Sequence, residues 1–350
     1  MTTKSYCTLF VIGLLFVSCE EAFLGSDVAN NPEQNFELLW DDLDQHYSLF
    51  TVRNLNWDSI YQVYRPQVTA QTTNKELFRI MADMIEYLDD SHTWIRTTDW
   101  SLYHSSGYTE NAKAHGEFSE LLVRDFYLEY ATYPDSNQAL YYGKIMDKDI
   151  GYIYLADMKR GANGAVIDAI LENIGHYQAI IFDIRNNGGG STTLPQRIAG
   201  AFADERRLVF THQTRNGPGH DDFEEAAQLY AEPLGSQNYS KPVIVLANRA
   251  TISASEQFVL YMRASPNVTL LGDTTAGDFG YRSNYRFLPN GWIYAYSIGR
   301  VLLPDGSSLD GVGHIPDIYA RNTPEGVYHE YKDGVLETAI EHLSQEYGIE

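Results

Sequence analysis

The chain contains 350 residues and carries a formal net charge of -22, from 25 basic and 47 acidic side chains. No basic cluster accompanies this acidic excess, so nucleic acid is not an expected partner. The length suits one large or two small domains, and no internal repeat interrupts it. Only 2 cysteines are present, and no Cys/His cluster has the spacing of metal ligands, so the sequence predicts neither a metal nor a cofactor.

The N-terminus has the pattern of an export signal. Lys4 supplies a positive charge, and residues 6–16 form an apolar run that is too short to span a membrane. Val17-Ser18-Cys19 then resembles the cleavage site of a bacterial lipoprotein, where Cys19 becomes the lipidated first residue of the mature chain. The alternative is an ordinary secretory signal. We therefore expect a lipoprotein signal peptide at residues 1–19 and a lipid anchor in the bacterial cell envelope, at the outer membrane or the periplasmic face.

The next segments have the patterns of a tether and a helical subdomain. Residues 20–34 are acidic and rich in Asn, which is typical of a flexible tether. Helical patterns follow at 57–64 and 75–88, and an earlier apolar face recurs at helical spacing, comprising Phe36, Leu39, Trp40, Leu43 and Tyr47. These patterns predict an N-terminal helical subdomain at residues 35–95. Residues 96–140 are rich in Tyr, His and Ser, and we expect an irregular insert or lid there.

From residue 141 onward, apolar strands alternate with helical patterns, which predicts an α/β layer architecture over residues 141–350. A hairpin is expected within residues 284–303, turning at Pro289-Asn290-Gly291, and an amphipathic helix at 333–343 closes the chain. Two helices are expected at 165–174 and 191–203. The expected strands cover residues 141–146, 151–155, 179–184, 208–212, 243–247 and 268–272.

A serine follows the buried strand at 243–247 in the sequence Ala250-Thr-Ile-Ser-Ala-Ser-Glu256. A helix that opens at Glu256 would place Ser253 near backbone N–H groups that favour developing negative charge. Ser253 is therefore a candidate nucleophile. The alternative is that Ser253 or Ser255 only caps the helix.

Two further patterns supply the other parts of a hydrolytic site. The strand at 179–184 runs into Gly188-Gly189-Gly190, whose amides can approach a ligand atom because no Cβ blocks them. No Lys follows these glycines as a phosphate-binding loop requires, so an oxyanion hole is the better functional interpretation, with a plain tight turn as the alternative. His92 ends the apolar helix at 75–88, within a polar cluster, and is the candidate general base.

Four motifs occur in the order of a known family: Asp90-Ser-His-Thr93, Asp183-Ile-Arg-Asn-Asn-Gly-Gly-Gly190, Ser253-Ala-Ser-Glu256 and Gly311-Val-Gly-His-Ile-Pro-Asp317. Together they resemble the serine peptidase family of carboxy-terminal processing peptidases, tricorn protease and the interphotoreceptor retinoid-binding protein. The resemblance extends from about residue 32 to the C-terminus. It implies the α/β spiral fold shared with ClpP and crotonase enzymes, with residues 141–350 as the catalytic domain.

The family uses two catalytic arrangements. Processing peptidases pair the serine with a lysine, but Asp278 occupies the matching position here. The tricorn-like arrangement implies Ser253 as nucleophile, His92 as base, and Ser91 beside it. The acid of this arrangement maps to Asp310, where tricorn-like proteins have the longer Glu.

By the same resemblance, the amides of Gly189 or Gly190 and of Ala254 form the oxyanion hole. The sequence thus predicts a cell-envelope serine peptidase that hydrolyses peptide or protein substrates by acyl transfer. The alternative is a non-catalytic ligand- or peptide-binding lipoprotein on the same scaffold. The change from Glu to Asp at position 310 is the feature that favours this alternative.

Overall fold

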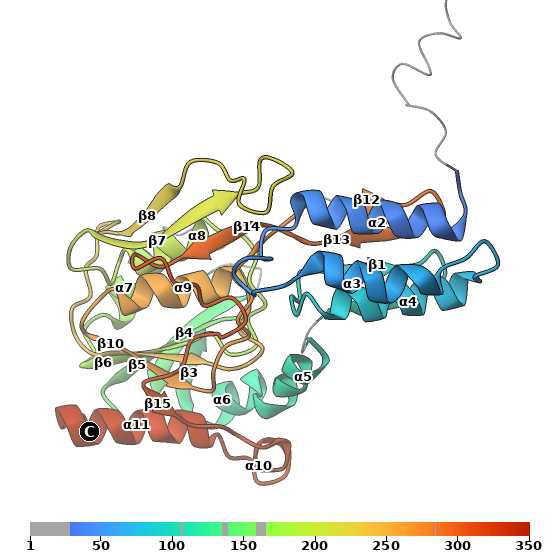
Figure 1. Cartoon of the computed structure of the whole chain (residues 1–350). Helices are drawn as coiled ribbons and strands as arrows, with labels where there is room; N and C mark the ends of the chain where they lie inside the picture. The colour runs from blue at the N-terminus through green and yellow to red at the C-terminus, as the bar shows by residue number, and fades with distance from the viewer. Residues whose placement is uncertain (1–28, 106–107, 135–138, 159–165, 284) are drawn as a thin grey trace, which may run out of the picture.

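The computed structural model describes residues 29–105, 108–134, 139–158, 166–283 and 285–350, which form an N-terminal lobe and a larger main lobe (Figure 1). The predicted signal peptide, Cys19 and most of the predicted tether lie outside these residues. The end of the tether prediction is wrong, because helix α2 already begins at Pro32. The side chain of Asn31 caps this helix by accepting the N–H of Gln34 at 2.9 Å.

The N-terminal lobe packs helices on one face of a small antiparallel sheet with the strand order β12-β13-β1-β2. The helices are α2 (Pro32–His46), α3 (Trp57–Tyr64), the 3-10 turn η1 (Arg65–Gln67) and α4 (Asn74–Glu86). The strands are β1 (Trp94–Arg96), β2 (Leu102–His104), β12 (Arg286–Phe287) and β13 (Ile293–Ala295). Helices α3 and α4 confirm the predictions at 57–64 and 75–88, and the β12–β13 pair confirms the predicted hairpin. This hairpin comes from the far end of the chain, so the lobe contains two separate segments of sequence.

The main lobe is built on a seven-stranded sheet with the order β15-β10-β9-β6-β5-β4-β3. Strands β5, β6, β9, β10 and β15 are parallel, whereas β4 and β3 continue the sheet in antiparallel pairs. These strands are β3 (Leu128–Thr132), β4 (Leu140–Ile145), β5 (Ile150–Leu155), β6 (Ala179–Asp183), β9 (Val243–Ala247), β10 (Val268–Gly272) and β15 (Ile318–Tyr319). The central strands are buried on both faces, as expected for parallel strands covered by helices.

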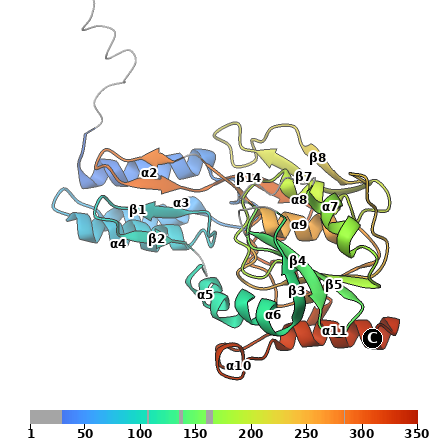
Figure 2. The same ribbon diagram turned by 180° about the vertical axis from the view of Figure 1, so that it is seen from behind.

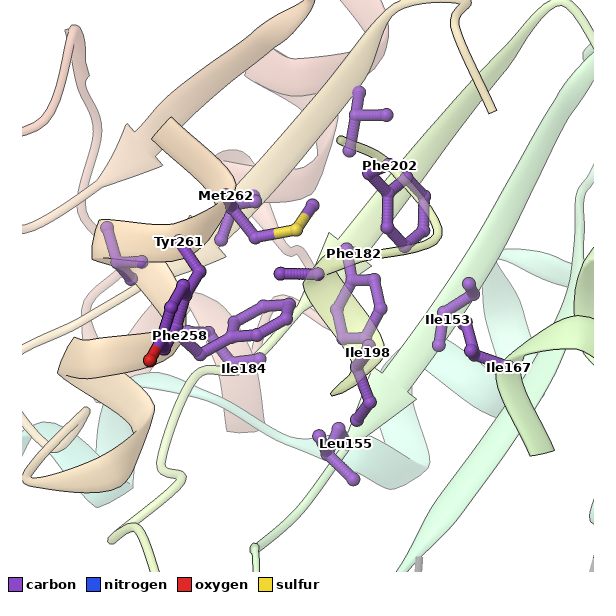
Figure 3. Close-up of a cluster of buried hydrophobic side chains, with 14 of the residues drawn as sticks. Ile153, Leu155, Ile167, Phe182, Ile184, Ile198, Phe202, Phe258, Tyr261 and Met262 are labelled. Carbon is purple, nitrogen blue, oxygen red and sulfur yellow. The ribbon is translucent and has the colours of Figure 1, made fainter. Parts of the chain in front are cut away.

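Alternating side chains of the sheet pack into two different cores. One face meets α7 (Val166–Ile174), α8 (Leu194–Ala199) and α9 (Ala254–Arg263). There Phe182 of β6 lies between Phe202 and Phe258, with ring centroids 6.0 and 4.9 Å away (Figure 3). The opposite face meets α6 (Glu120–Phe126) and α11 (Gly334–Tyr347), as Figure 1 shows for α11.

The prediction of an irregular insert at residues 96–140 is wrong. This segment contains β2, α5 (Tyr108–Lys113), the 3-10 turn η2 (Ala114–Glu117), α6 and β3. Its helices are short, and β3 is half-exposed at the edge of the sheet, so neither shows a long apolar periodicity. The regular structure of this segment is stabilised by packing, since Val123 and Leu128 are buried in the core that α11 covers.

A second small sheet, β11-β14-β7-β8, lies beside α8 and α9. Its strands are β7 (Arg207–Thr214), β8 (Ala227–Ala231), β11 (Tyr281–Arg282) and β14 (Ser297–Leu302), and α10 (Pro324–Tyr328) lies between β15 and α11 in sequence. β13 and β14 are separated only by Tyr296, so one extended stretch of chain belongs to both lobes. The loops that follow β6, β9 and β10 all leave the same edge of the main sheet, where the carboxyl ends of its parallel strands meet.

Candidate active site

Ser253 occupies the turn between β9 and α9, immediately before the first residue of the helix. Its backbone has φ 64° and ψ -123°, a conformation that a non-glycine residue rarely adopts. Such strain persists only where the surrounding structure enforces it, and it concentrates at functional sites. A half-buried serine held at positive φ between a strand and a helix has the backbone arrangement of a nucleophile elbow.

The neighbouring Ser255 has a different role from helix capping. Its hydroxyl donates to Oδ1 of Asn187 at 2.6 Å, and both side chains are buried. Asn187 in turn donates to the carbonyl of Leu155 at 2.8 Å. Ser255 therefore ties α9 to the glycine loop that follows β6, and the alternative role as a cap does not describe it.

The glycine loop packs directly against the Ser253 turn. Gly189 has φ 82°, and a Cβ at this position would lie 2.9 Å from the Cβ of Ser253 and 2.9 Å from the amide nitrogen of Ala254. Only glycine fits here, because the backbone conformation and the space both exclude a side chain.

The amides near Ser253 differ in their engagement. The N–H of Gly189 donates to Oδ1 of Asn187 at 3.0 Å, so it is already used within the loop. The N–H groups of Gly190 and Ala254 donate to no acceptor among the described residues. Of the predicted oxyanion donors, Gly190 and Ala254 are therefore available, whereas Gly189 shapes the loop.

His92 lies between α4 and β1, in the N-terminal lobe. Its Nδ1 is 3.5 Å from Oδ1 of Asp90, a carboxylate that is completely buried. Burial alone would lower the pKa of His92, but the adjacent Asp90 carboxylate and its charge raise that pKa above its ordinary value. Burial opposes ionisation of Asp90 as well, and His92 with Arg53 nevertheless lowers the pKa of Asp90 to about 2. The pair thus favours a charged carboxylate beside an imidazole that binds protons readily.

Ser91 links His92 to a second carboxylate. The Ser91 hydroxyl donates to Oδ2 of Asp278 at 2.5 Å, and its N–H donates to Oδ1 at 3.3 Å. Asp278 holds the position where the resemblance would place a catalytic lysine. Here Asp278 instead holds Ser91, which is next to His92 in the sequence, and this is consistent with the absence of a Ser–Lys dyad.

Glu256 joins Ser253 to this network. Its carboxylate accepts the N–H of Ser253 at 3.1 Å and the N–H of Asp278 at 2.9 Å. It also accepts from Thr275 Oγ1 and from the N–H of Gly277, both at 2.7 Å. Burial and the charge of Asp278 raise the pKa of Glu256 to about 8, although these donors oppose the shift. One carboxyl group therefore holds the strained serine and the loop that contacts Ser91.

Asp310 does not make the contact that the resemblance implied. Its Oδ1 accepts the N–H of Phe279 at 3.0 Å and lies 3.9 Å from the guanidinium of Arg53, and it contacts neither Ser91 nor His92. Asp is one methylene shorter than Glu, so its carboxylate remains with the loop after β10. Burial, opposed by Arg53, raises its pKa to about 7. The carboxylates that touch the Ser91–His92 pair are Asp90 and Asp278.

Arg53 supplies the buried positive charge of the cluster. It reaches from the N-terminal lobe to donate to the carbonyl of Gly277 at 3.3 Å and to Asp278 at 3.4 Å. No sequence pattern indicates Arg53, because this residue follows α2 in an irregular segment with no motif around it. The fourth sequence motif, Gly311–Asp317, also contacts this region, because Nε2 of its His314 lies 2.9 Å from the carbonyl oxygen of Glu256.

The structure thus brings together a strained serine, a histidine beside a buried carboxylate, and two amides without acceptors among the described residues, which are the kinds of group that a serine hydrolase uses. The family model for peptidase family S41 matches residues 149–320, and the model for the tricorn protease C1 domain matches residues 29–86. The chain belongs to peptidase family S41, a family of serine peptidases. This confirms the resemblance and the α/β fold class with a helical N-terminal region.

Curated relatives carry names of the same kind. The chain is 27% identical over 172 residues to a chloroplastic C-terminal processing peptidase of Tetradesmus obliquus, covering 49% of this chain and 35% of that protein. It is 26% identical over 182 residues to a carboxy-terminal processing protease of Bacillus subtilis, covering 51% and 37%. The matches thus span about a third of these relatives' own lengths.

Among solved structures, a candidate peptidase from Parabacteroides merdae is 30% identical, with a TM-score of 0.80, and the match covers 90% of this chain and 97% of that one. Mature CPAF has a TM-score of 0.70 at 12% identity, with coverage of 92% and 99%. Tricorn protease has a TM-score of 0.56 at 17% identity, covering 90% of this chain and 37% of its own. The last two similarities concern the fold alone.

Proposed function

We propose that this protein hydrolyses peptide bonds by acyl transfer, with Ser253 as the nucleophile and His92 as the general base. The observation that carries the proposal is the bonded path from Ser253 through Glu256 and Asp278 to Ser91, which fixes the nucleophile relative to the base. The contact of Glu256 with the N–H of Ser253 is also that of a helix capping box. A cap alone, however, needs neither the continuation of the path to Ser91 nor the backbone strain at Ser253. The names of the relatives indicate peptide or protein substrates.

In the proposed reaction, the hydroxyl oxygen of Ser253 attacks the carbonyl carbon of the scissile bond. Its proton passes to Nε2 of His92, because Nδ1 faces Asp90. The N–H groups of Gly190 and Ala254 hold the oxyanion of the tetrahedral intermediate. The intermediate collapses to an acyl-enzyme as His92 protonates the leaving amine, and water then repeats the sequence to release the acid and regenerate Ser253.

A fluorophosphonate probe tests this function directly, since the probe reacts only with an activated serine. We expect covalent labelling of the wild-type protein and none of Ser253→Ala, with the melting temperature nearly unchanged. Ser344→Ala, on α11, is the matched control and should label normally. An unlabelled wild-type protein that is folded would refute the proposal and favour a non-catalytic binding protein.

We also propose that the protein is a lipid-anchored component of the bacterial cell envelope. Support comes from the sequence of residues 1–19, with Cys19 as the acylated residue. Within the described part of the chain, no helix is both long enough and apolar enough to cross a membrane. Cys19→Ala should move the protein from the membrane fraction to the soluble fraction, and identical partitioning of both forms would refute the anchor.

A further inference from the structure

The sheet of the N-terminal lobe has one face that its helices do not cover. Ile95 and Tyr294 point into the helical core, as does Tyr103 in part. Because side chains alternate along a strand, Arg96, Leu102 and their cross-strand partners belong to the opposite face. Seen from behind, the strands lie in front of the helices (Figure 2). We call this surface the outer face.

The outer face carries exposed large side chains in a continuous row. The strand register places Leu102 beside Arg96, Arg96 beside Ile293, and Ile293 beside Phe287. Phe287 is 68% exposed, and Leu102 is also exposed. Tyr285 adds an exposed ring that contacts Trp94 of β1 at 5.5 Å. Exposed apolar patches of this kind mark binding surfaces.

Trp100 is the most informative residue of this face. It lies in the turn between β1 and β2 with φ 70°, a conformation that disfavours a bulky side chain. Its ring is nevertheless 75% exposed. Neither the turn geometry nor burial therefore accounts for a tryptophan there, since glycine or asparagine suits such a turn better. A large aromatic side chain held in the solvent is suited to contact with a ligand.

Arg96 on this face and Arg282 of the neighbouring strand β11 outnumber Asp99 of the Trp100 turn, so the local charge is opposite to that of the protein as a whole. Arg96 lies over the ring of Trp100 at 4.6 Å, and Arg282 lies over Tyr285 at 5.5 Å. Neither guanidinium forms an ion pair with a carboxylate of the described residues. The chain as a whole has a net charge of -22, but these two guanidinium groups attract anionic groups locally.

The outer face is continuous with the catalytic loop. Trp94 begins β1 only two residues after His92. His104 pairs with Trp94 across β1 and β2, and its Nδ1 lies 3.3 Å from the carbonyl oxygen of Ser91. A chain bound across the outer face is thereby adjacent to the loop that holds the base.

We propose that the outer face is a substrate-docking surface for extended polypeptide segments that carry both apolar and acidic side chains. This inference rests on the proposed peptidase function and names the substrate class for it. The aromatic and aliphatic side chains bind apolar residues, and Arg96 and Arg282 bind carboxylates. Docking there raises the local concentration of the scissile segment at Ser253.

The test uses the full chain carrying Ser253→Ala, so that binding is measured without cleavage. Three fluorescein-labelled peptides of equal length alternate Phe/Leu with Glu, Phe/Leu with Lys, or Ser with Glu, and affinity is read by fluorescence anisotropy. The Phe/Leu–Glu peptide should bind best, and added salt should weaken its binding. Trp100→Gly and Arg96→Gln should each reduce its affinity about tenfold. Equal binding of the Phe/Leu–Lys peptide would overturn the proposal.

Tyr331→Gly is the matched control, because Tyr331 is also an exposed aromatic residue at positive φ, but lies near α10. It should leave the affinity unchanged, whereas Trp100→Gly should weaken binding without lowering the melting temperature. Unchanged affinity in Trp100→Gly and Arg96→Gln would overturn the docking surface. Sedimentation and binding to anionic vesicles are measured for the wild type and for Trp100→Gly. A dimer or vesicle binding that is lost in Trp100→Gly would assign the outer face to a second copy or to a membrane, and would overturn the proposal.

Failure of the docking surface is distinguishable from failure of the proposed function. Fluorophosphonate labelling of Ser253 involves no peptide, so Trp100→Gly should label at the wild-type rate. The same variant, with Ser253 intact, should raise the KM for casein and leave kcat nearly unchanged. Normal labelling with an unchanged KM would overturn the docking surface alone.

Discussion

Three carboxylates influence the Ser91–His92 pair, two by direct contact and one by its charge alone. Asp90 lies beside the imidazole Nδ1, Asp278 accepts the Ser91 hydroxyl, and Asp310 contributes its charge from beside Arg53. The first two can set the tautomer and the position of the base, because they touch the pair directly. Asp310 lies further away and affects the pKa of His92 only through its charge.

Asp90→Asn should move the acid limb of activity to lower pH. The base must be neutral to accept a proton, and the Asp90 carboxylate raises the pKa of His92, so removing this charge lowers that pKa. The maximal rate should also fall, by up to ~10⁴, because Asn no longer holds the correct tautomer. The pH profile of the fluorophosphonate labelling rate measures both effects.

Asp310→Asn provides the comparison for this experiment. Its charge raises the pKa of His92 less than that of Asp90 does, so the acid limb should shift less and the maximal rate should fall less. A larger loss in Asp310→Asn than in Asp90→Asn would restore Asp310 as the principal acid.

Ser91→Ala and Asp278→Ala should damage labelling to similar extents, because each removes the same 2.5 Å hydrogen bond. The double variant should be no worse than the more damaging single one, since the two groups act as a unit. Additive losses would show that Asp278 acts on the site by another route, for example through its N–H contact with Glu256.

At the scale of elements, the site is a meeting of loops at the carboxyl edge of the main sheet. The glycine loop follows β6, the Ser253 turn follows β9, and the Asp278 loop follows β10. Glu256 and Asn187 are the buried side chains that fasten these loops to one another. Ser253 is therefore held by the packing of Gly189 against its turn and by the bond from its N–H to Glu256.

Gly189→Ala should displace the Ser253 turn and abolish labelling. The added Cβ would lie 2.7 Å from the carbonyl oxygen of Ile252 and 2.9 Å from the Cβ of Ser253, at a backbone φ of 82°. We expect a loss of about 1–3 kcal/mol in the free energy of unfolding. Gly188→Ala is the matched control, because a Cβ at that position would meet no atom within 4 Å. Equal effects of both substitutions would refute the close packing of Gly189 against the nucleophile.

Sequence patterns predicted the elements with strong local signals. The apolar run at 243–247 is β9, and the helical spacing at 57–64 is α3. The motif residues Ser253 and His92 were likewise recognisable, because a strand, a turn and a helix precede or follow them closely. The short helix α6 and edge strand β3 were missed because their burial depends on α11, more than two hundred residues later.

The partners of the motif residues were not predictable in the same way. The sequence showed only that Asp278 stands where processing peptidases have a lysine. Its hydrogen bond to Ser91 joins residues 187 positions apart. Arg53 meets Gly277 across 224 positions. No local pattern encodes such contacts, since they arise from the packing of one lobe against the other.

For the whole molecule, the buried cluster makes stability depend on pH. Folding raises the pKa of Glu256 to about 8 and that of Asp310 to about 7, and it also raises the pKa of His92. The folded state therefore retains protons that the unfolded chain releases at lower pH, from their ordinary pKa values upward. Two other histidines, His212 and His314, have pKa values lowered to about 4 by burial, and they act in the opposite direction below about pH 6.5. The free energy of unfolding should therefore fall as the pH rises from about 6.5 to about 8.

Urea unfolding at a series of pH values measures this slope, which can reach about 1.4 kcal/mol per pH unit for each group. Asp310→Asn should flatten the slope between about pH 4 and 7, because it removes one of the retained protons. A free energy of unfolding that is constant or increases between about pH 6.5 and 8 would contradict the cluster's raised pKa values.

The two-segment construction of the N-terminal lobe also sets the order in which the parts of the proposed site are synthesised. During synthesis, His92 emerges long before Ser253, and the β12–β13 hairpin that completes the sheet beside the base emerges after both. A growing chain that stops before Tyr296 therefore holds a nucleophile and a base with no finished framework between them. Under the proposed function, a nascent chain therefore gains the ability to cleave its neighbours, or itself, only after β12 and β13 have been made.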